Sequence, residues 1–202
     1  MTYCYFSQTK NPIHNMRIEE YLLSEGSDST ILFLYKNEPC ILAAPQTQLA
    51  LTDLPIYHRP SPGESFLCGD GVVQFAFITA RSRFSPAAQI TVVQKALQFL
   101  DIPTKPEGMA LYLSSGGECC QTSLLELSDN AWHHGALLVR SDLKGLSNLN
   151  PGRQYANLAD ENPAVSDSYV ASAMKYAFET EWGKCTELYL RKSDVLRKEN
   201  AI

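Results

Sequence analysis

The chain lacks the features that mark membrane and nucleic-acid-binding proteins. Among its 202 residues, no apolar run approaches the roughly 20 residues that a transmembrane helix requires. Basic residues number 17 against 22 acidic ones, for a net charge of -5, so no excess of positive charge could neutralise phosphates. The composition therefore predicts no membrane span and no nucleic acid partner.

An apolar leader is also missing, because polar residues recur every few positions from Met1 to His14. We therefore predict no secretory signal, and we interpret the six cysteines as reduced thiols of a cytoplasmic protein. Hydrophobic residues make up 45% of the chain, which is enough for a substantial core. We expect one domain over residues 1–190 and a polar C-terminal tail over residues 191–202.

Local patterns predict an α+β fold. Three amphipathic segments predict helices: 15–26 capped by Asn15, 86–101 capped by Ser85, and one from about 167 capped by Ser166 or Asp167. Runs of β-branched and aromatic residues predict strands at 2–6, 31–35, 40–44, 56–59, 72–80, 109–113, 120–127, 132–139 and 186–190.

Turn residues suggest how these strands connect. Residues 36–39 are typical of a hairpin turn between the second and third strands, and the prolines and glycines of residues 60–71 predict a loop. Residues 141–164 look irregular, with one short helix. Because most strands arrive as hairpins, we predict a mainly antiparallel sheet with the helices packed on one face.

Two adjacent pairs, Cys119-Cys120 and His133-His134, raise the question of a zinc site. Neighbouring residues in a strand point to opposite faces, so neither pair chelates as C-x-x-C or H-x-x-x-H does. We therefore predict no metal site.

The loop over residues 60–71 offers two further kinds of chemistry. Cys68 is the best-placed cysteine nucleophile, followed by Cys119, although free cysteines are more often small buried side chains. The backbone N–H groups of this glycine-containing loop could bind a phosphate. No Walker pattern is present, so an ordinary surface loop is the alternative.

Three segments, in this order, resemble the lipoate–protein ligase A family, whose fold biotin–protein ligases share. The first is the N-M-R-I-E-E-Y-L-L helix at 15–23, with the strands at 32–42. The second, at 58–78, aligns without gaps on the family signature R-R-x-S-G-G-G-x-V-x-H-D-x-G-N. The third is W-H-H-G-A-L-L-V at 132–139, which is similar to the family's H-H-G-T-L-L strand.

The resemblance implies a function. Family members condense lipoic or octanoic acid with ATP, then transfer the acyl group to a lysine of a lipoyl domain. It therefore implies ATP and Mg as cofactors of an active enzyme, although the residues themselves make no cofactor certain. The candidate ligand pocket that it implies comprises Arg59, Ser61, Gly63, Cys68, Gly71, His133, His134 and Gly135.

The chain departs from the family pattern where charge matters most. The lysine position of the family's K-x-x-G turn falls on Glu118, and its glycine falls on Gln121. Pro62-Gly63-Glu64 replaces the triple glycine, and Cys68-Gly69 replaces the His-Asp pair. At ~4 Å and an effective dielectric near 20, reversing one charge shifts the interaction energy by up to ~8 kcal/mol. That would remove most of the rate enhancement of adenylation.

Three hypotheses follow. The first is a divergent lipoate–protein-ligase-like domain without standard ATP-dependent adenylation, which still binds an acyl ligand or a lipoyl-domain partner. The alternative is an active ligase or acyltransferase that uses a relocated cation, such as Arg59, Arg81 or Arg83. The third is a structural subunit that docks onto an active ligase or a lipoyl domain. The sequence leaves open whether the chain is an enzyme.

Overall fold

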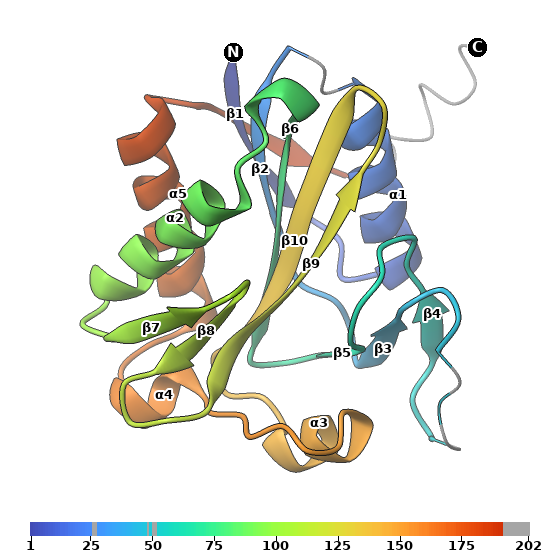
Figure 1. The fold of residues 1–202 in the computed structure, drawn as a ribbon, viewed down its shortest axis with the longest axis vertical. Helices are drawn as coiled ribbons and strands as arrows, with labels where there is room; N and C mark the ends of the chain where they lie inside the picture. The colour runs from blue at the N-terminus through green and yellow to red at the C-terminus, as the bar shows by residue number, and fades with distance from the viewer. Residues whose placement is uncertain (26–27, 48, 50–51, 192–202) are drawn as a thin grey trace.

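The computed structural model describes residues 1–25, 28–47, 49 and 52–191, and a large sheet forms its centre (Figure 1). The strands of this sheet are β1 (Thr2–Ser7), β2 (Thr30–Tyr35), β6 (Val72–Ala80), β7 (Thr104–Glu107), β8 (Ala110–Leu113), β9 (Glu118–Glu126), β10 (Asn130–Leu138) and β11 (Thr186–Leu190). They lie in the order β11-β1-β2-β6-β10-β9-β8-β7. Only the pairs β1–β2 and β1–β11 are parallel in this sheet; its other pairs are antiparallel.

A second, smaller sheet contains β3 (Cys40–Ala43), β4 (Ile56–His58) and β5 (Phe66–Cys68), with β3 in the middle. This arrangement corrects two predictions. Residues 36–39 do not form a hairpin turn, because β2 and β3 belong to different sheets; Asn15 Nδ2 holds this link by donating to Lys36 O and to Asn37 Oδ1. The predicted loop 60–71 contains β5, a short apolar run that the surrounding prolines and glycines conceal.

The longer helices are α1 (Pro12–Glu25), α2 (Pro86–Gln98) and α5 (Asp167–Trp182), and α3 (Leu143–Leu149) and α4 (Leu158–Glu161) are short. Ser85 and Ser166 cap α2 and α5 as predicted. Asn15 does not cap α1, because that helix begins at Pro12 and Asn11 Oδ1 accepts from the His14 N–H. The predicted helix end at Gly26 lies outside the described residues, and so do residues 192–202 of the predicted tail.

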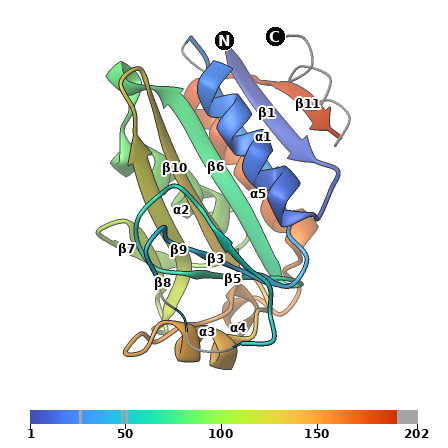
Figure 2. The ribbon, with the colours of Figure 1, turned by 90° about the vertical axis from the view of Figure 1, so that its right-hand side faces the viewer.

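Helices cover both faces of the main sheet (Figures 1 and 2). Helices α2 and α5 pack on the face that carries Phe75 and Phe77, whereas α1 packs on the opposite face against Phe33 and Trp132. The α+β class with a mainly antiparallel sheet is therefore confirmed, but the prediction that the helices lie on one face is wrong for α1. Strand β10 is buried at every position, so other elements have to pack against both of its faces.

No helix within the described residues is both long enough and apolar enough to cross a membrane.

Candidate functional site

The side chain of Arg59 is the centre of a buried polar network between α1, β9 and β10. Its Nη1 donates to Ser61 O at 2.6 Å, to Ser61 Oγ at 2.5 Å, to Pro62 O at 2.8 Å and to Ser123 Oγ at 3.1 Å. Its Nη2 donates to Glu64 O. Burial lowers the pKa of Arg59 to about 10, so the guanidinium stays charged at neutral pH. The loop after β4 is therefore folded around its own arginine.

The network continues through His134 to Glu19 of α1. Ser61 Oγ lies 2.7 Å from His134 Nε2, and His134 Nδ1 lies 3.5 Å from Glu19 Oε1, which also accepts from the Tyr35 hydroxyl. Because Ser61 Oγ accepts from Arg59, its own proton is available to His134 Nε2. Burial lowers the pKa of His134 and raises the pKa of Glu19, so the network favours neutral His134.

The order Ser61, His134, Glu19 is that of a nucleophile, a base and an orienting carboxylate. Ser61 is fully buried, however, and its oxygen is engaged by a cation that disfavours attack. We therefore assign these three residues to holding the loop in place rather than to chemistry.

A separate cavity of about 270 Å³ lies beside this network, between the Gly63-Glu64 turn, β8, β9 and Arg153. Glu118 and Gln121 line it and are almost fully buried. Arg153 stands at its edge, with Nη2 2.6 Å from Glu64 Oε1 and Nη1 3.7 Å from Glu118 Oε2. Sequence reasoning missed Arg153, because it lies in an irregular segment that carries no motif.

Two buried acceptor atoms belong to residues that line this cavity. Glu118 Oε2 and Gln121 Oε1 are buried and have no hydrogen-bond partner among the described residues. Burial raises the pKa of Glu118 to about 7, although Arg153 counteracts this and Glu64 adds to it. Glu118 is therefore close to half ionised at neutral pH.

The structure brings only some of the predicted pocket residues together. Arg59, Ser61 and His134 share the network, and Gly63, which has a φ of +106°, lies next to Arg59 and lines the cavity. Cys68 belongs to a buried cluster with Cys40, its partner across β3 and β5.

The other predicted residues face elsewhere. His133 points to the α2 side, where its Nδ1 lies 3.0 Å from Gln89 Oε1, and a Cβ on Gly135 would meet Phe75 on the same side. Gly71 forms the turn before β6, and its carbonyl accepts from the Val139 and Arg140 N–H groups. Of the three motif residues His133, His134 and Gly135, His134 therefore lies alone on the α1 face of β10, beside the Arg59 network.

The cysteines do not form a reactive centre. Cys119 and Cys120 are both buried in the main core, where desolvation raises the pKa of Cys119 to about 12. Cys68 is also buried, with Asn37 Nδ2 3.8 Å from its sulfur. In the part of the chain that the structure describes, no group of three or more His, Cys, Asp or Glu side chains could hold a metal ion.

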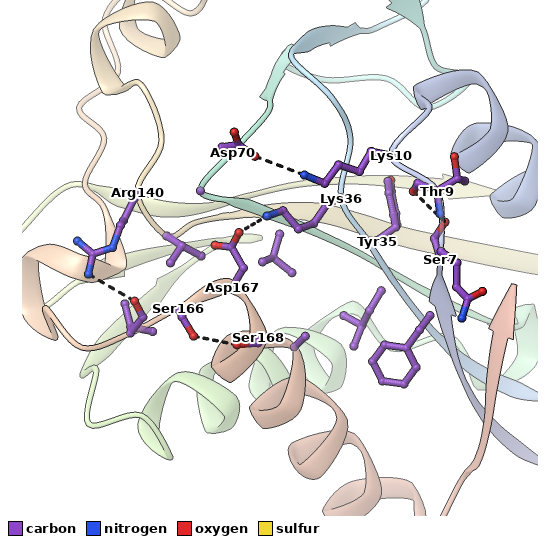
Figure 3. A pocket seen from close by; sticks show the side chains of 18 residues that line it. Ser7, Thr9, Lys10, Tyr35, Lys36, Asp70, Arg140, Ser166, Asp167 and Ser168 are labelled. Atoms are coloured by element: carbon purple, nitrogen blue, oxygen red, sulfur yellow. Dashed lines mark hydrogen bonds and ion pairs between the residues drawn. The ribbon is translucent and has the colours of Figure 1, made fainter. Parts of the chain in front are cut away.

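A larger cleft, of about 840 Å³, opens between the ends of β1 and β2 and the start of α5 (Figure 3). Ion pairs lie across it, Lys10 with Asp70 at 3.6 Å and Lys36 with Asp167. Of the predicted pocket residues, Gly71 alone lines this cleft. Its apolar side chains, such as Val73, belong to the α5 face of the sheet, so the cleft is distinct from the Glu118 cavity.

This α+β fold, with the signature loop packed over β9 and β10, defines the class of domain, and comparisons with known proteins identify its family. Residues 11–179 match the lipoyl protein ligase A/B catalytic domain. The chain therefore belongs to the lipoyl protein ligase A/B catalytic domain family.

Individual relatives agree with this assignment. A lipoate-protein ligase A of Psychrobacter cryohalolentis is 23% identical over 206 residues, which cover 88% of this chain and 61% of that protein. This chain thus spans about three fifths of the length of that curated relative.

Solved structures share the fold. P. falciparum LipL1 in complex with lipoate superposes with a TM-score of 0.88 at 17% identity, covering 98% of this chain and 68% of the other. A lipoate-protein ligase A bound with ATP superposes with a TM-score of 0.84 at 15% identity, covering 98% and 94%.

Proposed function

We propose that this chain is a lipoate–protein-ligase-like domain that does not activate lipoate with ATP. The observation that carries the proposal is the buried Glu118 carboxylate, which lines the cavity at the position that the resemblance assigns to the family's lysine. A cation there would stabilise the charge of an acyl phosphate, whereas a carboxylate repels it.

The surrounding charges strengthen this argument. Glu64, Glu107 and Glu118 line the cavity together with a single cation, Arg153, which already pairs with two of them. Arg59 cannot clamp a phosphate in this conformation, because Nη1 and Nη2 donate to Ser61, Ser123 and loop carbonyls. The residues present therefore do not fit a triphosphate, although one structural neighbour holds ATP.

The scaffold that would receive a ligand or partner is retained. The fold over 98% of the chain superposes on a lipoate complex with a TM-score of 0.88, and this likeness supports our proposal that lipoic or octanoic acid still binds. A lipoyl-domain protein is the partner that we propose, with the cytoplasm as the place where the two would meet. We propose that residues 1–190 act as one domain in this role.

Arg153 favours a second candidate function, an active ligase that uses a relocated cation. It is the cation at the cavity, and its side chain is 45% exposed. The cations that the sequence suggested for this role are engaged elsewhere. Both terminal nitrogens of Arg59 donate to Ser61, Ser123 and loop carbonyls, and Arg81 pairs with Glu126 at 3.3 Å. Arg83 contacts Ser29 O.

An intact-mass assay tests the proposal. The protein would be mixed with lipoate, ATP, magnesium and an apo lipoyl domain, at a concentration equal to that of the lipoyl domain, and in parallel with preformed lipoyl-adenylate. We expect no mass gain on the lipoyl domain with ATP and free acid. A gain in that arm would overturn the proposal.

The arginine variants then separate the two functions. If ATP supports transfer and R153A abolishes it while R81A does not, the relocated-cation enzyme is correct. Gain from preformed adenylate alone would mean that the transfer step survives while activation is lost.

A further inference from the structure

Two cysteines of the small sheet face each other across neighbouring strands. Cys40 of β3 and Cys68 of β5 are direct partners in an antiparallel pair, and both belong to the same buried cluster. Directly opposed residues of antiparallel strands have Cα atoms about 4.5–5.5 Å apart, which lies within the range of about 4.4–6.8 Å that disulfides span. The backbone therefore already places this pair where a disulfide requires it.

Hydrogen-bond donors converge on the sulfur of Cys68. Asn37 Nδ2 lies 3.8 Å from it, and Asn15 fixes the orientation of this amide by donating to Asn37 Oδ1 at 2.7 Å. A side-chain hydrogen bond with Cys68, together with burial, raises the pKa of Cys40. Because donors stabilise a thiolate relative to a thiol, Cys68 is the sulfur of this pair that is suited to attack.

A cation lies on the same side of β5 as Cys68. The Arg59 guanidinium carbon is 4.4 Å from the centre of the Phe66 ring, and Phe66 shares the cluster of Cys68 and lies two residues before it in the strand. Positive surroundings distinguish redox-active cysteines from structural ones. Cys119 shows the opposite environment, because burial and the neighbouring Glu118 carboxylate raise its pKa.

The position of Cys68 at a strand end gives a small oxidant a path to its sulfur. Cys68 is the last residue of β5 and is 4% exposed, and the turn that follows carries Asp70, whose side chain is 91% exposed. Only the end of a three-residue strand has to open locally for a molecule about the size of two waters to enter.

We propose that Cys40 and Cys68 are a redox-active pair, which hydrogen peroxide converts into a disulfide between β3 and β5. The Cys68 thiolate attacks one peroxide oxygen and becomes a sulfenic acid, and the departing hydroxide takes up the proton that Cys68 lost. The Cys40 sulfur then attacks the sulfenic sulfur, and its proton leaves with the hydroxyl group as a second water. Two thiols are thus oxidised to one disulfide while one peroxide is reduced to two waters.

This chemistry differs from attack on a substrate, for which the buried cysteines are unsuited, because the two sulfurs react with each other. The bridge would close residues 41–67 into a covalent ring that contains Arg59 and Ser61 of the signature loop. It would therefore restrain this loop in the unfolded chain and stabilise the folded one. The inference concerns regulation of the scaffold and does not depend on whether the domain activates lipoate.

Peroxide treatment of the folded full chain, followed by alkylation and non-reducing peptide mapping, tests the pair. We expect a protein that has lost two hydrogens, a peptide containing Cys40 joined to one containing Cys68, and reversal by dithiothreitol. Cys119 and Cys120 are an internal control, because they are equally buried but adjacent in one strand, and they should stay reduced. The disulfide should raise Tm by about 5 °C or more.

Three variants complete the test. C185S removes the half-buried thiol, whereas the other five cysteines are buried, and it should still form the bridge. C40A and C68A should each abolish the bridge and the rise in Tm. A bridge that forms only after denaturation, a bridge from either residue to another cysteine, or an unchanged Tm in fully bridged protein would overturn the inference. The wild-type peptide map decides the question even where a buried variant fails to fold.

Discussion

Two neighbouring polar regions of the molecule differ in how their charged side chains are paired. Around Arg59, the guanidinium donates only to uncharged oxygens of the signature loop and of β9, and Ser61 links this loop to His134 of β10. Around Glu118, three glutamates line a cavity, and Arg153 at its edge lies within 4 Å of two of them. The first region behaves as a structural clamp, and the second is a cavity with crowded negative charge.

The two regions also differ in how their residues compare with the family signature. Arg59 and Ser61 match the family signature, yet here they bind the loop to the sheet. Glu118 and Gln121 depart from the family pattern, yet they line the cavity where a ligand could bind. We therefore expect substitutions at Arg59 and Ser61 to affect stability first, and substitutions at Glu118 to affect the cavity.

The strongest test of the clamp is R59A. Removing the buried guanidinium deprives Ser61 O, Ser61 Oγ, Ser123 Oγ and Glu64 O of a donor, and it leaves Pro62 O with Ser123 Oγ alone. We therefore expect the free energy of unfolding to fall by about 3–5 kcal/mol. Urea unfolding measures this, with R81A as an exposed control that should change stability by less than about 1 kcal/mol. A loss for R59A as small as that for R81A would show that the region is not a clamp.

The contribution of Glu118 to the free energy of unfolding should depend on pH. The pKa of Glu118 is raised from 4.5 to about 7 by folding, so the native state binds more protons than the unfolded state between these values. Stability that this group contributes is complete below pH 4.5 and is lost as pH rises through about 7. That loss amounts to about 2–3 kcal/mol.

E118Q removes this titration. The free energy of unfolding of E118Q, minus that of the wild type, should therefore become more positive by about 2–3 kcal/mol as pH rises over that interval. Taking the difference cancels the titration of other groups, and E126Q on the exposed part of β9 should show no such trend. A pH-independent difference would contradict the buried, charge-crowded environment assigned to Glu118.

The smallest expected change in stability concerns the hydrogen bond between Ser61 and His134 within the clamp. S61A leaves His134 Nε2 buried without its donor, and we expect a loss of about 1–2 kcal/mol in urea unfolding. S128A, at an exposed turn, is the matched control and should be neutral. If S61A were also neutral, the hydrogen bond between Ser61 and His134 would not contribute to the clamp.

Local patterns predicted much of the fold because they depend on near neighbours in the chain. The N-caps Ser85 and Ser166 and the long strands β6 and β10 follow from residues within a few positions of one another. Strand β7 was missed, because its Thr-Lys-Pro-Glu sequence resembles a loop. The pairing of β2 and β3 was wrong, because a turn-like link cannot reveal which sheet each strand joins.

The candidate site was predictable only in part, because local patterns do not reveal contacts between distant segments of the chain. Strand alternation alone could have separated His133 and Gly135 from His134, because they lie on the other face of β10. No local signal placed Arg153, 35 residues after Glu118 in the chain, at the edge of the same cavity. That contact depends on how the irregular segment after β10 folds back.

The sequence by itself determined the α+β class, most of the strands and helices, the family resemblance and the charge reversal at Glu118, because each depends on residue type and short spacing. Only the tertiary structure decided which polar groups satisfy one another. Hydrogen bonding of buried groups depends on contacts between segments far apart in the chain, so packing alone made Arg59 a clamp and brought Arg153 to the edge of the Glu118 cavity.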